Sequence, residues 1–223
     1  MDLVDINGFS HSVLTEQLPN MDTLHINLLE TEENLFHALH KKNRKQIKNA
    51  QTRDFTVEVI TSPTKEDLKK FQKLYNEFAR GKKTYTCNAY HMDTMYRLIK
   101  QDALVLTKLK NNVGETLCYR IYVTDGNTVM SLYSLSLYRE RTIPEEKRLL
   151  SEASRYLLWS NILYFKKTNH KIYDMGGLTD NPNIRSFKME FGGSLSQVYS
   201  GYAANSGRGK LVLWLRRMTM RKG

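Results

Sequence analysis

Cysteine is scarce in this sequence, and its scarcity narrows the chemistry that the chain can perform. The 223 residues include only two cysteines, Cys87 and Cys118, which are far apart and have no CxxC spacing. This excludes the cysteine patterns of structural zinc sites and of thioredoxin-like redox proteins. His37 and His40 are close enough in sequence to form a pair of metal ligands, but no third ligand accompanies them. We therefore expect no metal site.

Long apolar runs are also missing. No stretch of about 18 consecutive apolar residues is present, so the sequence predicts no transmembrane helix. The first residues include Asp2 and Asp5 and lack the apolar core of a secretory signal peptide. We therefore expect a cytoplasmic protein.

Acidic residues are absent from two segments, 41–53 and 191–223, and both segments are rich in lysine and arginine. Their basic residues are Lys41, Lys42, Arg44, Lys45, Lys48, Arg53, Arg208, Lys210, Arg216, Arg217, Arg221 and Lys222. The net charge of the whole chain is +11, so the remainder of the chain is nearly neutral. Localised positive charge favours a polyanionic partner such as a phosphate-bearing cofactor, a nucleic acid or an anionic membrane. Solvated basic faces that only aid solubility are the alternative.

The hydrophobic pattern predicts an alternation of strands and helices. We expect strands at 24–29, 55–60, 103–109, 116–124, 128–137, 171–176 and 195–204. We expect helices at 31–50, 62–81, 89–100, 144–168 and 182–191, with Thr31 and Ser62 as N-caps and Gly81 as a helix end. This order is typical of a mixed sheet with helices on both faces in one α/β domain.

The C-terminal segment 209–223 places Trp214 and several leucines beside five basic residues. Two interpretations fit this composition. It could dock on an anionic membrane, which would make the protein peripheral to the inner face of that membrane. It could equally be a last strand with a basic end.

Three stretches resemble a known family, the Fem-type peptidoglycan-bridge aminoacyltransferases, which form a branch of the Gcn5-related N-acetyltransferase (GNAT) fold. Segment 37–50 resembles the family's basic helix, and segment 137–171 resembles the chain leading into and through its central helix. Segment 173–193, which begins YDMGGL and ends FKMEFGG, resembles the family signature Y-D-x-G-G…F-K-x-x-F-G-G. The resemblance implies a single acyl-CoA N-acyltransferase-like domain at 55–223. Residues 1–54 would form a strand-helix extension whose basic helix packs on that domain.

The family implies an enzyme that moves an acyl group from acyl-CoA to an amine, such as an amino sugar or a cell-envelope precursor. Transfer from aminoacyl-tRNA is the alternative, and a non-catalytic module that binds tRNA or an anionic membrane is another. Fem-type ligases have two tandem domains, whereas this chain has room for one. The glycine-rich phosphate loop of acetyl-CoA-dependent relatives is also missing from 136–150. Arg139 and Arg141 could supply the charge for donor phosphates at the N-terminus of the helix that starts near Pro144.

The resemblance identifies Lys188 as the lysine that contacts the acyl carbonyl. Its ammonium can donate a hydrogen bond to the oxyanion that develops during acyl transfer. The alternative is an ordinary solvated lysine. Phe187 would be its packing partner and part of the donor site, and an ordinary core phenylalanine is the alternative. Gly176 and Gly177 would let the donor or a loop approach the backbone closely, because glycine has no Cβ. A plain turn is the alternative for this pair.

Asp174 is the candidate for accepting the proton of the incoming amine or for holding its ammonium form. It could instead accept hydrogen bonds from backbone donors of the following loop. Lys42, Arg44 and Lys48 could bind the phosphates of an acceptor such as a nucleotide-linked sugar, or the backbone of tRNA. A solvated helix face is again the alternative.

Overall fold

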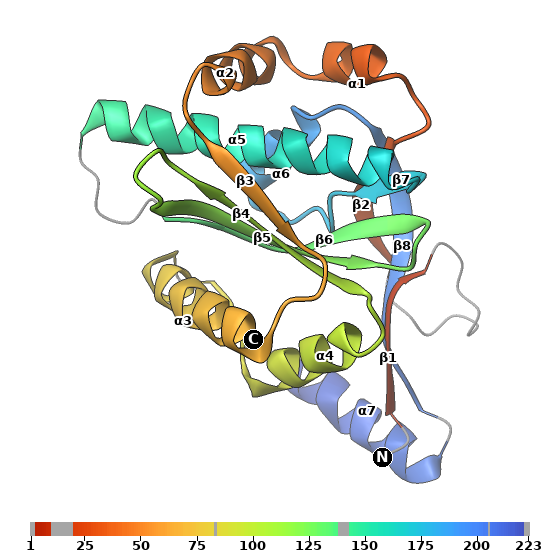
Figure 1. The fold of residues 1–223 in the computed structure, drawn as a ribbon. Coiled ribbons are helices and arrows are strands. Elements are labelled where there is room, and N and C mark those ends of the chain that lie inside the picture. The colour runs from red at the N-terminus through yellow and green to blue at the C-terminus, as the bar shows by residue number, and fades with distance from the viewer. Residues whose placement is uncertain (1–2, 10–19, 83, 138–142, 205, 221–223) are drawn as a thin grey trace.

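An eight-stranded mixed sheet organises the computed structural model, which describes residues 3–9, 20–82, 84–137, 143–204 and 206–220 (Figure 1). In spatial order the strands are β1 (Leu3–Phe9), β8 (Ser194–Ala204), β2 (Asn20–Asn27), β7 (Ile172–Asp174), β6 (Thr128–Ser136), β5 (Thr116–Thr124), β4 (Leu104–Lys110) and β3 (Thr56–Ile60). All neighbouring strands are antiparallel except β6 and β7, which are parallel.

Helices cover both faces of this sheet (Figure 1). One face carries α3 (Lys65–Lys82) and α4 (Ala89–Ile99). The other face carries the long α5 (Pro144–Lys167) and α6 (Pro182–Met189), with α1 (Glu32–Ala38) and α2 (Lys41–Gln51) on the outer side of α5. A last helix, α7 (Gly207–Met220), follows β8. The predicted mixed α/β architecture is confirmed.

Buried apolar side chains fill both layers between sheet and helices. On the α5 face, Leu24, Tyr122, Phe165 and Tyr173 belong to one buried cluster. On the α3 and α4 face, Phe71 is fully buried against the central strands. Strand β2 belongs to residues 1–54, the segment expected to form an N-terminal extension. It lies inside the sheet, between β7 and β8.

The single helix predicted for 31–50 is wrong, because the chain turns at Leu39 and His40. Both residues have extended backbone angles, and the buried Leu39 side chain reaches the core. The break is stabilised from outside the segment, since the backbone N–H of His40 donates to the carbonyl of Glu190 at 2.9 Å. Arg44 Nη1 donates to the carbonyls of His37 (2.8 Å) and Leu39 (2.6 Å), which the break leaves without helical partners.

Two further expectations need correction. The N-cap of α3 is Thr64 rather than Ser62, because Thr64 and Asp67 exchange side-chain-to-backbone hydrogen bonds at 2.9 and 3.1 Å. Residues 211–220 do not form a strand but belong to α7. Its apolar and basic residues do not alternate, so the sequence carries no period-2 signal that would favour a strand.

Candidate active site in the fork between β6 and β7

The sheet divides where β6 leaves β7. Their parallel pairing runs from Thr128 and Ile172 to Met130 and Asp174 and then stops. An extra residue of β6, Leu132, lies between the pairs that β6 forms with β5. Such a bulge bends and twists a strand. We call the space between 131–136 and 175–178 the fork.

The segment after β7 follows β2 instead of β6, which keeps the fork open. The backbone N–H of Met175 donates to the carbonyl of Leu24 at 2.9 Å, and that of Leu178 donates to the carbonyl of Asp22 at 2.7 Å. No described strand pairs with this edge of β6 beyond Met130. The fork therefore has the backbone groups of β6 on one side and a glycine loop on the other.

Gly176 lies where the two sides of the fork are closest. Its φ of +74° is in the left-handed region, and a Cβ on it would lie 2.7 Å from the carbonyl oxygen of Ser131. Only glycine satisfies both conditions without a backbone shift. At Gly177 the atoms nearest to an added Cβ belong to the flexible side chain of Met21. Gly176 thus allows a close approach of the Ser131 carbonyl, whereas an approach by the donor stays a prediction.

Lys188 reaches the fork from the last turn of α6. Its Nζ donates to the carbonyls of Gly176 (2.9 Å) and Gly177 (2.8 Å). Burial lowers the pKa of the ammonium from its usual 10.5 to about 8; Asp174 acts in the opposite direction, and Arg120 lowers the pKa further. A lysine ammonium has three N–H donors, and these two carbonyls use two of them. The side chain is thus held in place, and within the described part of the chain the third donor has no partner and is available to a ligand.

Asp174 is buried and acts as a brace for the same loop. One carboxylate oxygen accepts from the hydroxyl of Thr23 and from the backbone N–H of Gly176, the latter at 2.8 Å. The other oxygen lies 3.5 Å from Nε2 of His25. These contacts fit the predicted hydrogen-bonding role of Asp174, whereas its role as a base stays a prediction.

Arg120 is a charged residue of this region that the sequence reasoning missed. It lies in the middle of β5 with only 5% of its surface exposed, and its Cα partner on β6 is Ser134, beside the fork. Among the residues that the structure describes, no carboxylate lies within ion-pair distance of its guanidinium. A buried cation without an acidic partner is costly. The sequence does indicate this residue, because Arg120 is the single charged residue in the otherwise apolar segment 117–123.

Phe187 packs in the layer of helices, against the buried core cluster and beside the guanidinium of Arg155. Its ring lies 5.4 Å from that of Phe191 and 5.1 Å from the guanidinium of Arg155, measured between centres. The predicted pair Phe187 and Lys188 is therefore divided between the helix layer and the fork. No described contact brings Phe187 to the fork.

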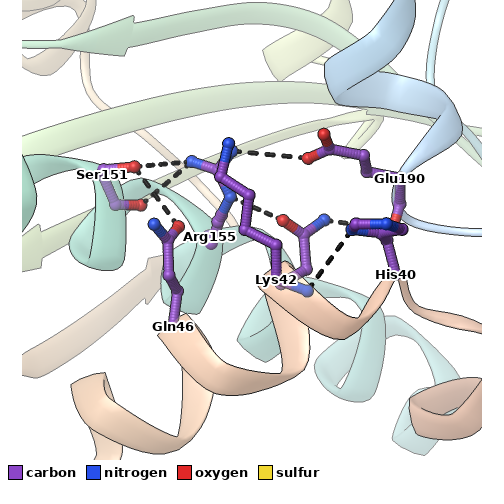
Figure 2. A network of polar contacts seen from close by, with 7 residues as sticks. His40, Lys42, Gln46, Ser151, Arg155 and Glu190 are labelled. Carbon is purple, nitrogen blue, oxygen red and sulfur yellow. Dashed lines mark hydrogen bonds and ion pairs between the residues drawn. The ribbon is translucent and has the colours of Figure 1, made fainter.

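Arg155 of α5 is the centre of the network in Figure 2, which joins α2, α5 and α6. Its Nε donates to Oδ1 of Asn43 at 2.6 Å, and its Nη1 donates to Oγ of Ser151 at 2.7 Å. Its Nη2 lies 3.5 Å from Oε2 of Glu190, the residue that follows α6. Because Glu190 is two residues beyond Lys188, this network fixes the end of α6 that carries the lysine.

The three predicted phosphate-binding residues of α2 are not equivalent. The side chain of Lys42 is exposed. Its backbone N–H donates to Nδ1 of His40 at 3.3 Å, a contact that caps the start of α2. Arg44 caps α1, so its contacts explain it without a ligand. Lys48 Nζ lies 5.8 Å from the centre of the Phe36 ring. Arg139 and Arg141, the predicted donor-binding arginines, lie outside the described residues.

A cleft of about 930 Å³ opens at the other end of β6, and Asp174 but not Lys188 lines it. The remaining lining comes chiefly from the ends of α4 and α5 and from the β5–β6 turn. Among the described residues, the fork but not this cleft brings a half-buried lysine next to backbone groups that no strand pairs. Across the described ranges, no group of three His, Cys, Asp or Glu side chains is placed to hold a metal ion. None of the described helices is long and apolar enough to cross a membrane.

A mixed sheet that divides between two central parallel strands, with helices on both faces, defines the GNAT-like acyltransferase fold. Comparison with solved structures supports this class. The chain is similar to FemX with a TM-score of 0.66 and 14% identity, over 89% of this chain and 65% of the FemX chain. The predicted resemblance to the Fem-type proteins is confirmed at the level of the fold.

Two other solved structures share this fold. One is L-PGS from Bacillus licheniformis, with a TM-score of 0.55 and 14% identity over 90% of this chain and 66% of that one. The other is the C-terminal DUF2156 domain of a protein from Agrobacterium fabrum assigned as a lysylphosphatidylglycerol synthetase, with a TM-score of 0.56 and 9% identity over 91% and 66%. The chain spans about two thirds of the length of each structure. No protein-family model and no curated protein sequence matches it.

Proposed function

We propose that this protein transfers an acyl or aminoacyl group to an amine, and that the reaction takes place in the fork. The observation that carries the proposal is the position of Lys188. Its ammonium is half-buried, is fixed by the carbonyls of Gly176 and Gly177, and has one N–H donor that no other described residue uses. Such a preorganised donor in a desolvated place is the arrangement that stabilises an oxyanion.

In the proposed reaction the amine nitrogen attacks the carbonyl carbon of the donor directly. A C–N bond forms, the C–S bond of a thioester or the C–O bond of an aminoacyl ester breaks, and the amine proton leaves with a base or with the leaving group. Lys188 donates its third hydrogen bond to the carbonyl oxygen as negative charge develops there. With a pKa of about 8, the lysine is mostly protonated at neutral pH and can fill this role. Asp174 is the proposed acceptor of the amine proton.

An acyl-CoA donor is the first candidate, because one domain suffices for that chemistry. Aminoacyl-tRNA is the second candidate. The likeness to the lysylphosphatidylglycerol synthetase domain supports it, since that name specifies an amino acid as the transferred group. Both donors are cytoplasmic, so the proposal includes a cytoplasmic site of action. An amino sugar or a cell-envelope precursor is the proposed acceptor, and the exposed Lys42 of α2 is the proposed contact for its phosphates.

Thermal-shift measurements with coenzyme A, aminoacyl-tRNA and nucleotide sugars separate the donors, because a ligand that binds the folded state raises the apparent stability. Stabilisation by coenzyme A identifies a thioester donor. Stabilisation by charged tRNA, with a steep loss at higher salt, identifies the second candidate. If neither donor class stabilises the protein, the proposed function is wrong.

The donor that binds is then used in a transfer assay with the Lys188→Met variant. We expect the turnover number to fall roughly 100-fold or more, which is typical of the loss of one oxyanion donor. Lys166→Met is the matched control, because Lys166 Nζ also donates to two backbone carbonyls, those of Leu28 (2.9 Å) and Glu30 (2.6 Å), but at the far end of α5. Undiminished turnover in a folded Lys188→Met protein would contradict the assigned role.

A further inference from the structure

Helix α7 presents an apolar surface that the rest of the described chain does not cover. Leu211, Trp214 and Leu215 have i, i+3 and i+4 spacing and therefore lie on one side of the helix, and Val212 lies next to them. The exposed fractions of the side chains are 57% for Leu211, 55% for Trp214, 51% for Leu215 and 50% for Val212. Leu213, on the opposite side, is half-buried, and α7 contacts β8. Four adjacent exposed apolar residues are unusual for a surface helix and mark an interaction site.

All charged residues of α7 are basic. Arg208 and Lys210 are exposed, and Arg216 and Arg217 follow in the sequence of α7. No acidic residue occurs anywhere from Phe191 to the end of the chain. A helix that combines leucine and tryptophan with lysine and arginine, and that has no acidic residue, has the composition of an interfacial membrane helix.

We propose that α7 docks this protein on an anionic lipid bilayer, with Leu211, Trp214 and Leu215 inserted among the headgroups. Charge favours a bilayer over a second copy of the chain. A symmetric dimer through α7 would bring the basic residues of both copies together, whereas anionic headgroups complement them. The apolar side chains would be buried in the interface, and the basic side chains would remain at the level of the lipid phosphates.

Tryptophan fluorescence of the full chain tests this docking directly. The protein has two tryptophans: Trp159 is 3% exposed, whereas Trp214 is 55% exposed. With vesicles of phosphatidylcholine mixed with phosphatidylglycerol, the emission should shift to the blue, and the protein should sediment with the vesicles. Trp214→Phe should abolish the shift but keep the binding. An unchanged emission spectrum, or equal binding to pure phosphatidylcholine vesicles, would overturn the proposal.

Surface variants separate insertion from charge without threatening the fold. We expect Leu211→Ser with Leu215→Ser to weaken vesicle binding roughly tenfold or more, because less apolar surface is inserted. Val113→Ser, at a residue that is 78% exposed in the β4–β5 turn, should leave binding unchanged. If the leucine variants instead abolish a concentration-dependent dimer in sedimentation equilibrium and leave vesicle binding unaffected, the surface binds a second copy and the proposal is wrong.

The charge requirement has its own control. Arg208→Gln with Lys210→Gln should lower the affinity for the phosphatidylglycerol vesicles roughly 25-fold, at about fivefold for each basic residue near an anionic surface. The same change on α2, Lys41→Gln with Lys45→Gln, should have little effect. Equal losses from the two pairs would mean that the whole basic surface attracts vesicles, and would overturn the assignment of docking to α7.

Discussion

The pKa of Lys188 can be measured without knowing any substrate. The structure lowers this pKa from the usual 10.5 to about 8, chiefly because burial disfavours the charged ammonium. Each pKa unit corresponds to about 1.4 kcal/mol, so the full shift would correspond to about 3.5 kcal/mol. Solvent still reaches part of the side chain and screens its charge, so we expect about 1–2 kcal/mol in practice.

This shift makes stability depend on pH in a defined direction. Between about pH 8 and pH 10.5 the folded state binds fewer protons at Lys188 than the unfolded chain does. The free energy of unfolding contributed by this residue therefore rises with pH across that interval. Urea denaturation of the wild type and of Lys188→Met, compared at each pH, isolates the contribution. The difference between the two proteins should move by about 1–2 kcal/mol in favour of the wild type.

Two neighbouring charges act on Lys188 in opposite directions, which provides a sharper test. Removal of the positive charge in Arg120→Met should raise the pKa of Lys188, whereas removal of the negative charge in Asp174→Asn should lower it. NMR titration of isotope-labelled methylated lysine resolves both changes. A wild-type pKa of about 10 or higher by that titration, or a shift of the pKa in the same direction in both variants, would contradict the predicted environment of Lys188.

Three other predictions concern stability and reactivity. Gly176→Ala should lower the free energy of unfolding by at least about 1 kcal/mol more than Gly114→Ala does. Both glycines have a positive φ, but of the two only Gly176 has a carbonyl in contact with an added Cβ. Equal losses of stability in urea denaturation would contradict the close approach at Gly176. Asn43→Ala should cost about 1–3 kcal/mol, because it removes the 2.6 Å acceptor of the Arg155 guanidinium; a loss within the error of denaturant titration would show that the network adds little. Burial raises the pKa of the Cys118 thiol to about 11, so folded protein at pH 8 should resist iodoacetamide at this residue until urea is added; rapid labelling of folded protein, located by mass spectrometry, would show that the thiol is accessible.

Local signals were sufficient for most of the elements. The central helix was predicted at 144–168 and is found at Pro144–Lys167, because a proline in the first turn and an apolar stripe mark it clearly. The strand predicted at 116–124 has the same bounds in the structure. The break between α1 and α2 could not be predicted in this way. It depends on the carbonyl of Glu190, about 150 residues away in sequence, and on Arg44.

By itself, the sequence determined the order of the elements, the glycine loop at 176–177, the candidate lysine and the absence of acidic residues from the last 33 positions. Only the tertiary structure decided where these features meet. The fork exists because Leu132 bulges out of β6 while the chain after β7 bonds to β2. Lys188 has a lowered pKa because residues distant in sequence exclude water from it. Desolvation and non-local hydrogen bonding arise only when separated segments pack together, so no local pattern of residues encodes them.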